Sequence, residues 1–201
     1  MSSTAGTPEG PARSTAGRLL VAPPALRDPN FTETVVLMLT HNDEGAFGLV
    51  LNRVSQMAVH SILPAWEDRC SAPTRVFGGG PVQLNAAVGL VRVTSATEGV
   101  ALARTPAWPL ASKTLGDLGT VDLDRDPALI PAIANLRIFA GYSGWGAGQL
   151  DGEIEMGGWI VVDARPDDPF DPDPLNLWAR VLSRQGGLLG SLARTPDPAW
   201  N

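Results

Sequence analysis

The residue with the strongest chemical signature is a serine inside a glycine-rich segment. Ser143 lies within Gly141-Tyr142-Ser143-Gly144-Trp145, after an apolar run and before a predicted helix, which is the setting of a nucleophile elbow in serine hydrolases. That elbow needs glycine where Trp145 stands, and its chain order places the histidine after the serine, whereas His41 and His60 both precede Ser143. The pattern therefore favours a tight strand-to-helix corner, in which Ser143 caps the helix.

A second glycine-rich segment, Gly78-Gly79-Gly80-Pro81, follows a short apolar run. Glycine-rich loops let backbone amides approach an anion closely. The segment lacks both the Gly-Lys-Ser/Thr ending of a P-loop and the G-x-G-x-x-G spacing of a dinucleotide site. A turn or bulge that needs positive φ angles explains the glycines equally well, so they are candidates for ligand contact.

Imidazole and amide side chains flank the strands expected over residues 34–40 and 46–52. Asn30, His41 and Asn52 would supply the polar part of a small-molecule site if these strand ends converged. The alternative is that the asparagines hydrogen-bond the backbone of turns, which is their commoner use. The two histidines, without acidic residues at ligand spacing, do not indicate a transition-metal site.

The charged residues argue against several other functions. Glu153 and Glu155 are two positions apart, so on a helix they point in different directions, form no carboxylate pair and are expected to be solvated. Arg180 and Arg184 share one helix face, but they follow an acidic stretch over residues 167–173. Because the net charge of −6 also repels phosphate backbones and anionic lipids, direct nucleic-acid binding and membrane binding are not expected.

Composition indicates one globular domain. The chain has 201 residues, of which 44% are hydrophobic and 18% charged. Cys70 is the single cysteine, which excludes an intramolecular disulfide and indicates a reducing, cytoplasmic compartment. No apolar run approaches the roughly 20 residues that span a bilayer, and the N-terminus has no apolar signal region. We expect a disordered leader over residues 1–16, a single domain over 17–194 and a flexible tail over 195–201.

Apolar runs and turn residues predict the secondary structure. Strands are expected over residues 18–22, 34–40, 46–52, 75–77, 87–93, 136–141 and 159–162, and the second and third form an antiparallel hairpin. These two strands are apolar at nearly every position, so both of their faces should be covered. Helices are expected over residues 54–63, 128–135, 146–156 and 173–185, the second with Asp126 as its N-cap. The stretch 94–126 has a weak pattern of short strands and loops.

Five motifs, taken in order, resemble a known family. They are Gly17 to Pro23; Asp28-Pro29-Asn30-Phe31; His41-Asn42 with Gly45 to Asn52; Gly78 to Val82; and Gly141 to Trp145 with Gly148-Gln149-Leu150 and Glu153-Ile154. Together they resemble the YqgE/AlgH family of uncharacterised bacterial proteins over nearly the whole domain. The resemblance implies an α+β fold with a mostly antiparallel, branched sheet that is curled into a pseudo-barrel and flanked by helices. It implies no catalytic residue, substrate or cofactor, although some members have a proposed role in regulating alginate synthesis, sometimes described as transcriptional.

These observations predict a non-enzymatic binding or regulatory module without a cofactor, whose partner is a small ligand or a protein. Glycine, aromatic and amide residues cluster in it without a matching set of acid, base and nucleophile. The candidate ligand-binding residues are Asn30, His41, Asn52, Gly78, Gly79, Gly80, Tyr142, Ser143 and Trp145. A transcriptional regulator and a hydrolase that uses Ser143 with His41 are the alternatives.

Overall fold

The computed structural model describes residues 14–93, 116–130 and 133–192. Most of the expected leader, the expected tail over 195–201 and the larger part of the weakly patterned stretch 94–126 lie outside these residues. Among the helices of the described part, none is long and apolar enough to cross a membrane.

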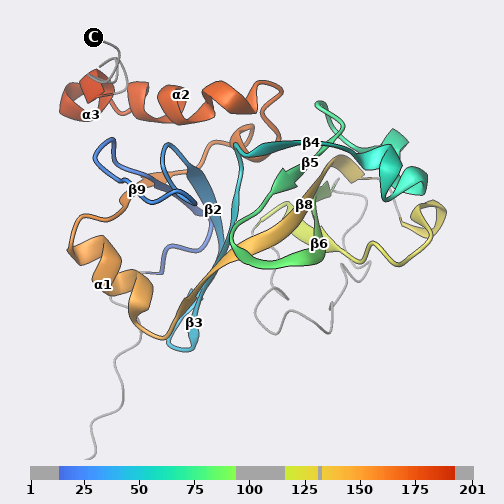
Figure 1. Ribbon diagram of the computed structural model, residues 1–201, viewed down its shortest axis with the longest axis horizontal. Helices are drawn as coiled ribbons and strands as arrows, with labels where there is room; N and C mark the ends of the chain where they lie inside the picture. The colour runs from blue at the N-terminus through green and yellow to red at the C-terminus, as the bar shows by residue number, and fades with distance from the viewer. Residues whose placement is uncertain (1–13, 94–115, 131–132, 193–201) are drawn as a thin grey trace, which may run out of the picture.

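The described residues form a single nine-stranded sheet with helices packed on it (Figure 1). Its strands are β1 (Arg18–Val21), β2 (Val35–Asn42), β3 (Gly45–Val50), β4 (Val54–Ala58), β5 (Arg75–Gly78), β6 (Val82–Val93), β7 (Leu118–Val121), β8 (Ile133–Gly146) and β9 (Ile160–Asp163). The main path runs β4-β5-β8-β3-β2-β1-β9, and β6 joins it by pairing with both β8 and β7. Every pairing is antiparallel except that of β5 with β8.

Strand β8 is the branch point of the sheet. Its first part lies between β5 and β6, and its last four residues pair with β3. The α+β class and the branched, mostly antiparallel sheet are thus confirmed. Among the described strands the sheet stays open rather than closing into a barrel, because β4 and β9 end the path without pairing with each other.

The hairpin of β2 and β3 is confirmed, and both of its faces are covered. Along β2, Val35 and Leu37 point into the core beneath helix α2 (Leu177–Ser183), whereas Val36 and Met38 point toward helix α1 (Gln149–Glu155). The two helices lie on opposite sides of this part of the sheet (Figure 1). A strand buried on both faces loses the polar alternation of a half-exposed strand, which is why the run is apolar throughout.

Two of the expected helices are wrong. Residues 54–58 form β4, because Val54 and Ala58 pair with β5, and only the short 3-10 turn Val59–Ser61 follows. Over residues 128–135 the helix stops after the 3-10 turn Pro127–Leu129, and Ile133 already belongs to β8. In both places the backbone hydrogen bonds of the sheet override local helix signals. The expected N-cap is present, since the Asp126 carboxylate accepts from the Ala128 amide at 2.9 Å.

Most of the remaining helical elements lie after β8 and include a C-terminal pair. Helix α1 is shorter than expected, and the last expected helix consists of the 3-10 turn Pro174–Asn176 and α2. Helix α3 (Gly187–Leu192) follows directly and packs on α2. Another 3-10 turn, Asp168–Phe170, lies between β9 and α2, and a longer one, Pro64–Arg69, precedes β5.

Candidate functional site

Ser143 does not lie at a strand-to-helix corner, as the sequence predicts, but inside strand β8. Its hydroxyl is fully buried and donates a hydrogen bond to the carbonyl oxygen of Gly79 at 3.2 Å. In the sheet, Ser143 lies opposite Gly48 of β3, and β3 separates it from β2, which carries His41. Two strand spacings of about 4.8 Å separate β8 from β2, and His41 lies beyond Met38, the residue of β2 that is opposite Gly48, which takes it still further from the serine. This geometry does not assemble a nucleophile and a base.

The predicted glycine segment lies against β8, beside Ser143. The Gly79 amide donates to the carbonyl of Ala140 at 2.9 Å, and a Cβ on Gly80 would lie 2.3 Å from the backbone of Tyr142. Gly80 has a φ of +149°, a conformation that L side chains rarely adopt. Backbone contact with β8 therefore accounts for Gly79 and Gly80, and the Tyr142 ring packs beside Phe47 with ring centroids 4.8 Å apart.

His41 lies at the end of β2 and is buried between the N-terminal segment and helix α1. Its Nδ1 accepts a hydrogen bond from the Thr15 amide at 3.3 Å and lies 3.0 Å from the Thr15 hydroxyl. Its Nε2 lies 3.4 Å from the Asp151 carboxylate. The imidazole therefore has a partner at both nitrogens, and its side chain is only 2% exposed. It holds the segment around Thr15 against β2 rather than facing a ligand.

The candidate asparagines do not converge with His41. Asn52 bridges the start of β2, accepting from the Val35 amide at 2.9 Å and donating to the Glu33 carbonyl at 2.8 Å. His41 lies six residues further along β2, a distance of about 20 Å on a strand. Asn30 is exposed in the turn before β2, where its backbone N–H donates to the carboxylate of Asp28. The backbone-bonding alternative thus describes Asn52.

Trp145 belongs to an aromatic cluster, centred on Glu153, that sequence reasoning missed. The indole N–H groups of Trp145 and Trp159 both donate to one carboxylate oxygen of Glu153 at 2.9 Å, and Gln149 donates to the other oxygen at 2.9 Å. The ring of Phe31 packs on both indoles. The expectation that both glutamates are solvated is therefore wrong for Glu153, whereas Glu155 is exposed.

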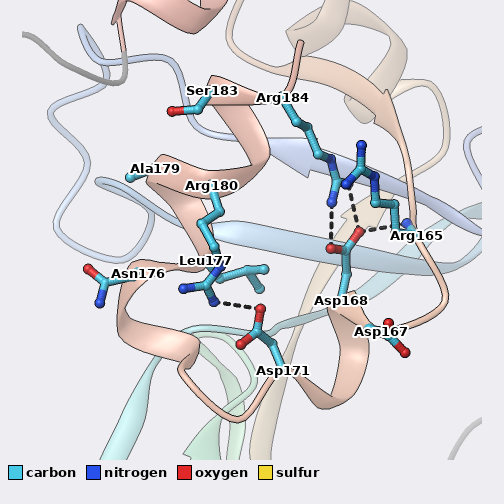
Figure 2. Close-up of a pocket in the computed structure, with 10 residues that line it drawn as sticks. All are labelled: Arg165, Asp167, Asp168, Asp171, Asn176, Leu177, Ala179, Arg180, Ser183 and Arg184. Atoms are coloured by element: carbon cyan, nitrogen blue, oxygen red, sulfur yellow. Dashed lines mark hydrogen bonds and ion pairs between the residues drawn. The ribbon is translucent and has the colours of Figure 1, made fainter.

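A cleft with polar lining residues lies elsewhere, between α2 and the segment 165–171 (Figure 2). Its volume is about 580 Å³, within the usual range of small-molecule sites. It is lined by Arg165, Asp167, Asp168, Asp171, Asn176, Leu177, Ala179, Arg180, Ser183 and Arg184. None of these residues is among the candidates from sequence.

Arg180 of α2 and Arg184, the residue that follows α2, line one side of this cleft and are held by aspartates. Arg184 and Asp168 form a two-bond fork of 2.6 and 2.7 Å, in which the Asp168 side chain is buried and that of Arg184 is half-buried. Arg180 donates to Asp171 at 2.5 Å and to Asp173 at 2.8 Å. Hydrogen bonds from Asn176 and Arg180 hold the pKa of Asp173 below its usual range. Such fixed, planar guanidinium groups are preorganised for recognition.

The segment 165–171 is also anchored from beneath, by arginines of the sheet. Arg137 of β8 donates to the carbonyls of Pro169 and Asp171 at 3.0 and 2.9 Å, and Arg92 of β6 donates to the carbonyl of Pro166. Arg137 is almost fully buried over the ring of Phe77, and burial lowers its pKa to about 10 although Asp171 opposes the change. A buried cation is costly, so the position of this wall is strongly determined.

The sequence contains little that would reveal the cleft. Asp168 and Arg184 are 16 positions apart, and only the path from β9 to α2 brings them together. The alternation of aspartate and proline over residues 167–174 indicates a stiff loop, which is the one signal that could have directed attention there. No group of three or more His, Cys, Asp or Glu residues in the described part of the chain is placed to hold a metal ion.

Comparison with known proteins places most of the chain within one family model. The model, described as AlgH-like, matches residues 19–190. A UPF0301 protein of Streptomyces coelicolor is 47% identical over 191 residues, which cover 94% of this chain and 96% of that protein. A UPF0301 protein of Mycobacterium leprae is 44% identical over 187 residues, covering 92% of this chain and 89% of that protein.

Two solved structures share the fold. The crystal structure of a Corynebacterium diphtheriae protein superposes with a TM-score of 0.76 at 31% identity, over 89% of this chain and 91% of that one. The solution structure of the AlgH protein from Pseudomonas aeruginosa superposes with a TM-score of 0.64 at 27% identity, over 97% of this chain and 99% of that one.

Proposed function

The chain belongs to the AlgH-like family, and we propose that it is a non-enzymatic binding module that holds a small ligand in the cleft between α2 and the segment 165–171. One observation carries this proposal: Arg180 and Arg184, two of the three arginines that line the cleft, are fixed by aspartates before any ligand arrives. A cavity with a few convergent polar groups on rigid elements is the usual form of a ligand site.

The buried cation of Arg137 supports the same conclusion. Its guanidinium holds the carbonyls of Pro169 and Asp171 in place from the core side. A well-packed apolar residue often stabilises a protein as much as a buried charge does, so the stability of the fold alone gives little reason for an arginine at this position. The arginine is explained if the position of the segment 165–171 determines ligand affinity.

The described residues lend little support to the two alternatives. A hydrolase needs a base within hydrogen-bond reach of its nucleophile, and Ser143 is instead buried and bonded to Gly79. A regulator that binds DNA directly needs cations free to meet phosphates, and Arg180 and Arg184 are already paired with aspartates. We also place the module in the cytoplasm, since Cys70 is its single cysteine.

The test is a thermal-shift screen against nucleotides, sugar phosphates, amino acids, polyamines and short peptides. A ligand at 100 times its Kd stabilises the folded state by about 2.7 kcal/mol, which raises the melting temperature measurably. Ala179→Trp fills the cleft from helix α2, and Ala25→Trp places the same side chain on an exposed turn as the matched control. We expect a ligand that stabilises the wild type and Ala25→Trp but not Ala179→Trp. If every hit stabilises all three proteins, or none stabilises any, the cleft is not the ligand site.

A further inference from the structure

The charge inside the cleft indicates which ligands it binds, and we propose that the ligand carries an oxyanion, a carboxylate or a phosphate, held by Arg165. This inference rests on the proposed function of the cleft. It starts from the imbalance between Arg165, Arg184 and Asp168, which meet at one end of the cleft. The whole lining balances three arginines against three aspartates. At this end, however, the carboxylate of Asp167 points away (Figure 2), so that two guanidinium groups face the single carboxylate of Asp168.

Asp168 accepts three hydrogen bonds, and none of them comes from the guanidinium of Arg165. Its Oδ1 accepts from Arg184, and its Oδ2 accepts both from Arg184 at 2.7 Å and from the backbone amide of Arg165 at 2.6 Å. Its side chain is 6% exposed, so it is fixed in that position. Its hydrogen bonds therefore go to Arg184 and to the backbone, and not to the side chain of Arg165.

The guanidinium of Arg165 has no hydrogen-bond or ion-pair partner among the residues that the structure describes. Figure 2 shows its side chain extending from the wall segment toward Arg184, whereas the carboxylate of Asp167 points away from α2. An arginine has five N–H donors in a planar arrangement that matches the two oxygens of a carboxylate or phosphate. An unneutralised fork at the edge of a preorganised cleft is thus a receptor for an oxyanion.

The attraction of an oxyanion by Arg165 is a local effect, because the overall charge of the protein is negative. With a net charge of −6, the molecule as a whole repels anions. An oxyanion therefore binds only where the local field is reversed, and Arg165 supplies that reversal. Because Arg165 is exposed, salt should weaken the interaction.

The experiment is calorimetric titration with two probes, inorganic pyrophosphate and citrate, at low and at physiological ionic strength. Arg165→Gln removes the charge in the cleft, and Arg27→Gln removes one from an exposed turn outside it. We expect wild type and Arg27→Gln to bind at least one probe with equal affinity, and Arg165→Gln to bind it about tenfold more weakly or worse. Tighter binding of pyrophosphate identifies a phosphate ligand, and tighter binding of citrate identifies a carboxylate ligand.

The failures of the two proposals are distinguishable. If Arg165→Gln and Arg27→Gln bind the probe equally well, or if neither probe binds the wild type, the oxyanion inference is overturned. When a neutral or cationic ligand from the thermal-shift screen is nevertheless lost in Ala179→Trp, the cleft still binds a ligand and only its proposed chemistry is wrong. When no ligand of any class responds to Ala179→Trp, both proposals fail.

Discussion

The hydroxyl of Ser143 and the carbonyl oxygen of Gly79 are 3.2 Å apart and form a hydrogen bond in the core of the protein. The same carbonyl accepts from the Val50 amide at 2.9 Å. One glycine oxygen thus connects strands β8 and β3 to the segment that follows β5. The residue with the strongest sequence signature for catalysis has a structural hydrogen bond instead.

Replacing Ser143 by alanine should lower the free energy of unfolding by about 1 kcal/mol, the usual value of one such hydrogen bond. Urea denaturation followed by fluorescence measures this change. A fluorophosphonate probe, which labels activated serines, should leave the wild type unmodified. Stoichiometric labelling of the wild type that disappears in Ser143→Ala would instead establish a catalytic serine.

Gly80→Ala tests whether the glycine segment is required for backbone contact. A Cβ there would lie 2.3 Å from the Tyr142 carbonyl at a φ of +149°, so we expect a loss of more than about 2 kcal/mol. Gly152→Ala is the matched control, because Gly152 lies inside α1 with open space around it, and helix propensity predicts a gain of up to about 1 kcal/mol. Equal stability of the two variants in thermal denaturation would contradict the close-contact account.

The sequence determines some elements of this fold much more clearly than others. The β2–β3 hairpin is predictable because two continuous apolar runs flank a short polar turn. The replacement of a helix by β4 is not, because it depends on pairing with β5, about twenty residues further along the chain. The residues of the cleft are hidden for the same reason. Arg165, Asp168 and Arg184 form an ordinary charged pattern in sequence, and the path from β9 to α2 alone brings them together.

Glu153→Ala should destabilise the protein by about 1–3 kcal/mol. It removes a carboxylate that accepts hydrogen bonds from the indoles of Trp145 and Trp159, and hydrogen bonds to charged groups contribute more than neutral ones. Both indole N–H groups lie in buried residues, so they would lose their partner without gaining full access to water. Urea denaturation measures the loss, and the tryptophan emission spectrum should shift.

Glu155→Ala provides the control for this prediction. Glu155 lies on the same helix, two residues away, and is exposed. Its removal changes the net charge by the same amount, so a general charge effect would appear equally in both variants. We expect Glu155→Ala to stay within about 0.5 kcal/mol of the wild type, and a similar loss in the two variants would show that the aromatic cluster does not depend on Glu153.

Cys70 should be unreactive in the folded protein. Burial, together with the negative charge of Glu67, raises the pKa of this thiol from about 9.0 to about 11. The thiolate is the reactive form, and two pKa units make its population at pH 8 about a hundredfold smaller than in the unfolded chain. Iodoacetamide at pH 8 should therefore modify the denatured protein quickly and the native protein very slowly, as followed by mass spectrometry.

The raised pKa of Cys70 also predicts how the stability of the protein changes at alkaline pH. A pKa that is raised on folding contributes stability that is present below the unfolded value, near pH 9, and is lost as pH rises toward about 11. The free energy of unfolding of the wild type should therefore fall over this range more steeply than that of Cys70→Ala. Glu67→Gln should also accelerate alkylation of the native protein, because it removes the second cause of the raised pKa. Parallel pH profiles for wild type and Cys70→Ala, or alkylation at equal rates in native and denatured protein, would show that the thiol is accessible and its pKa unshifted.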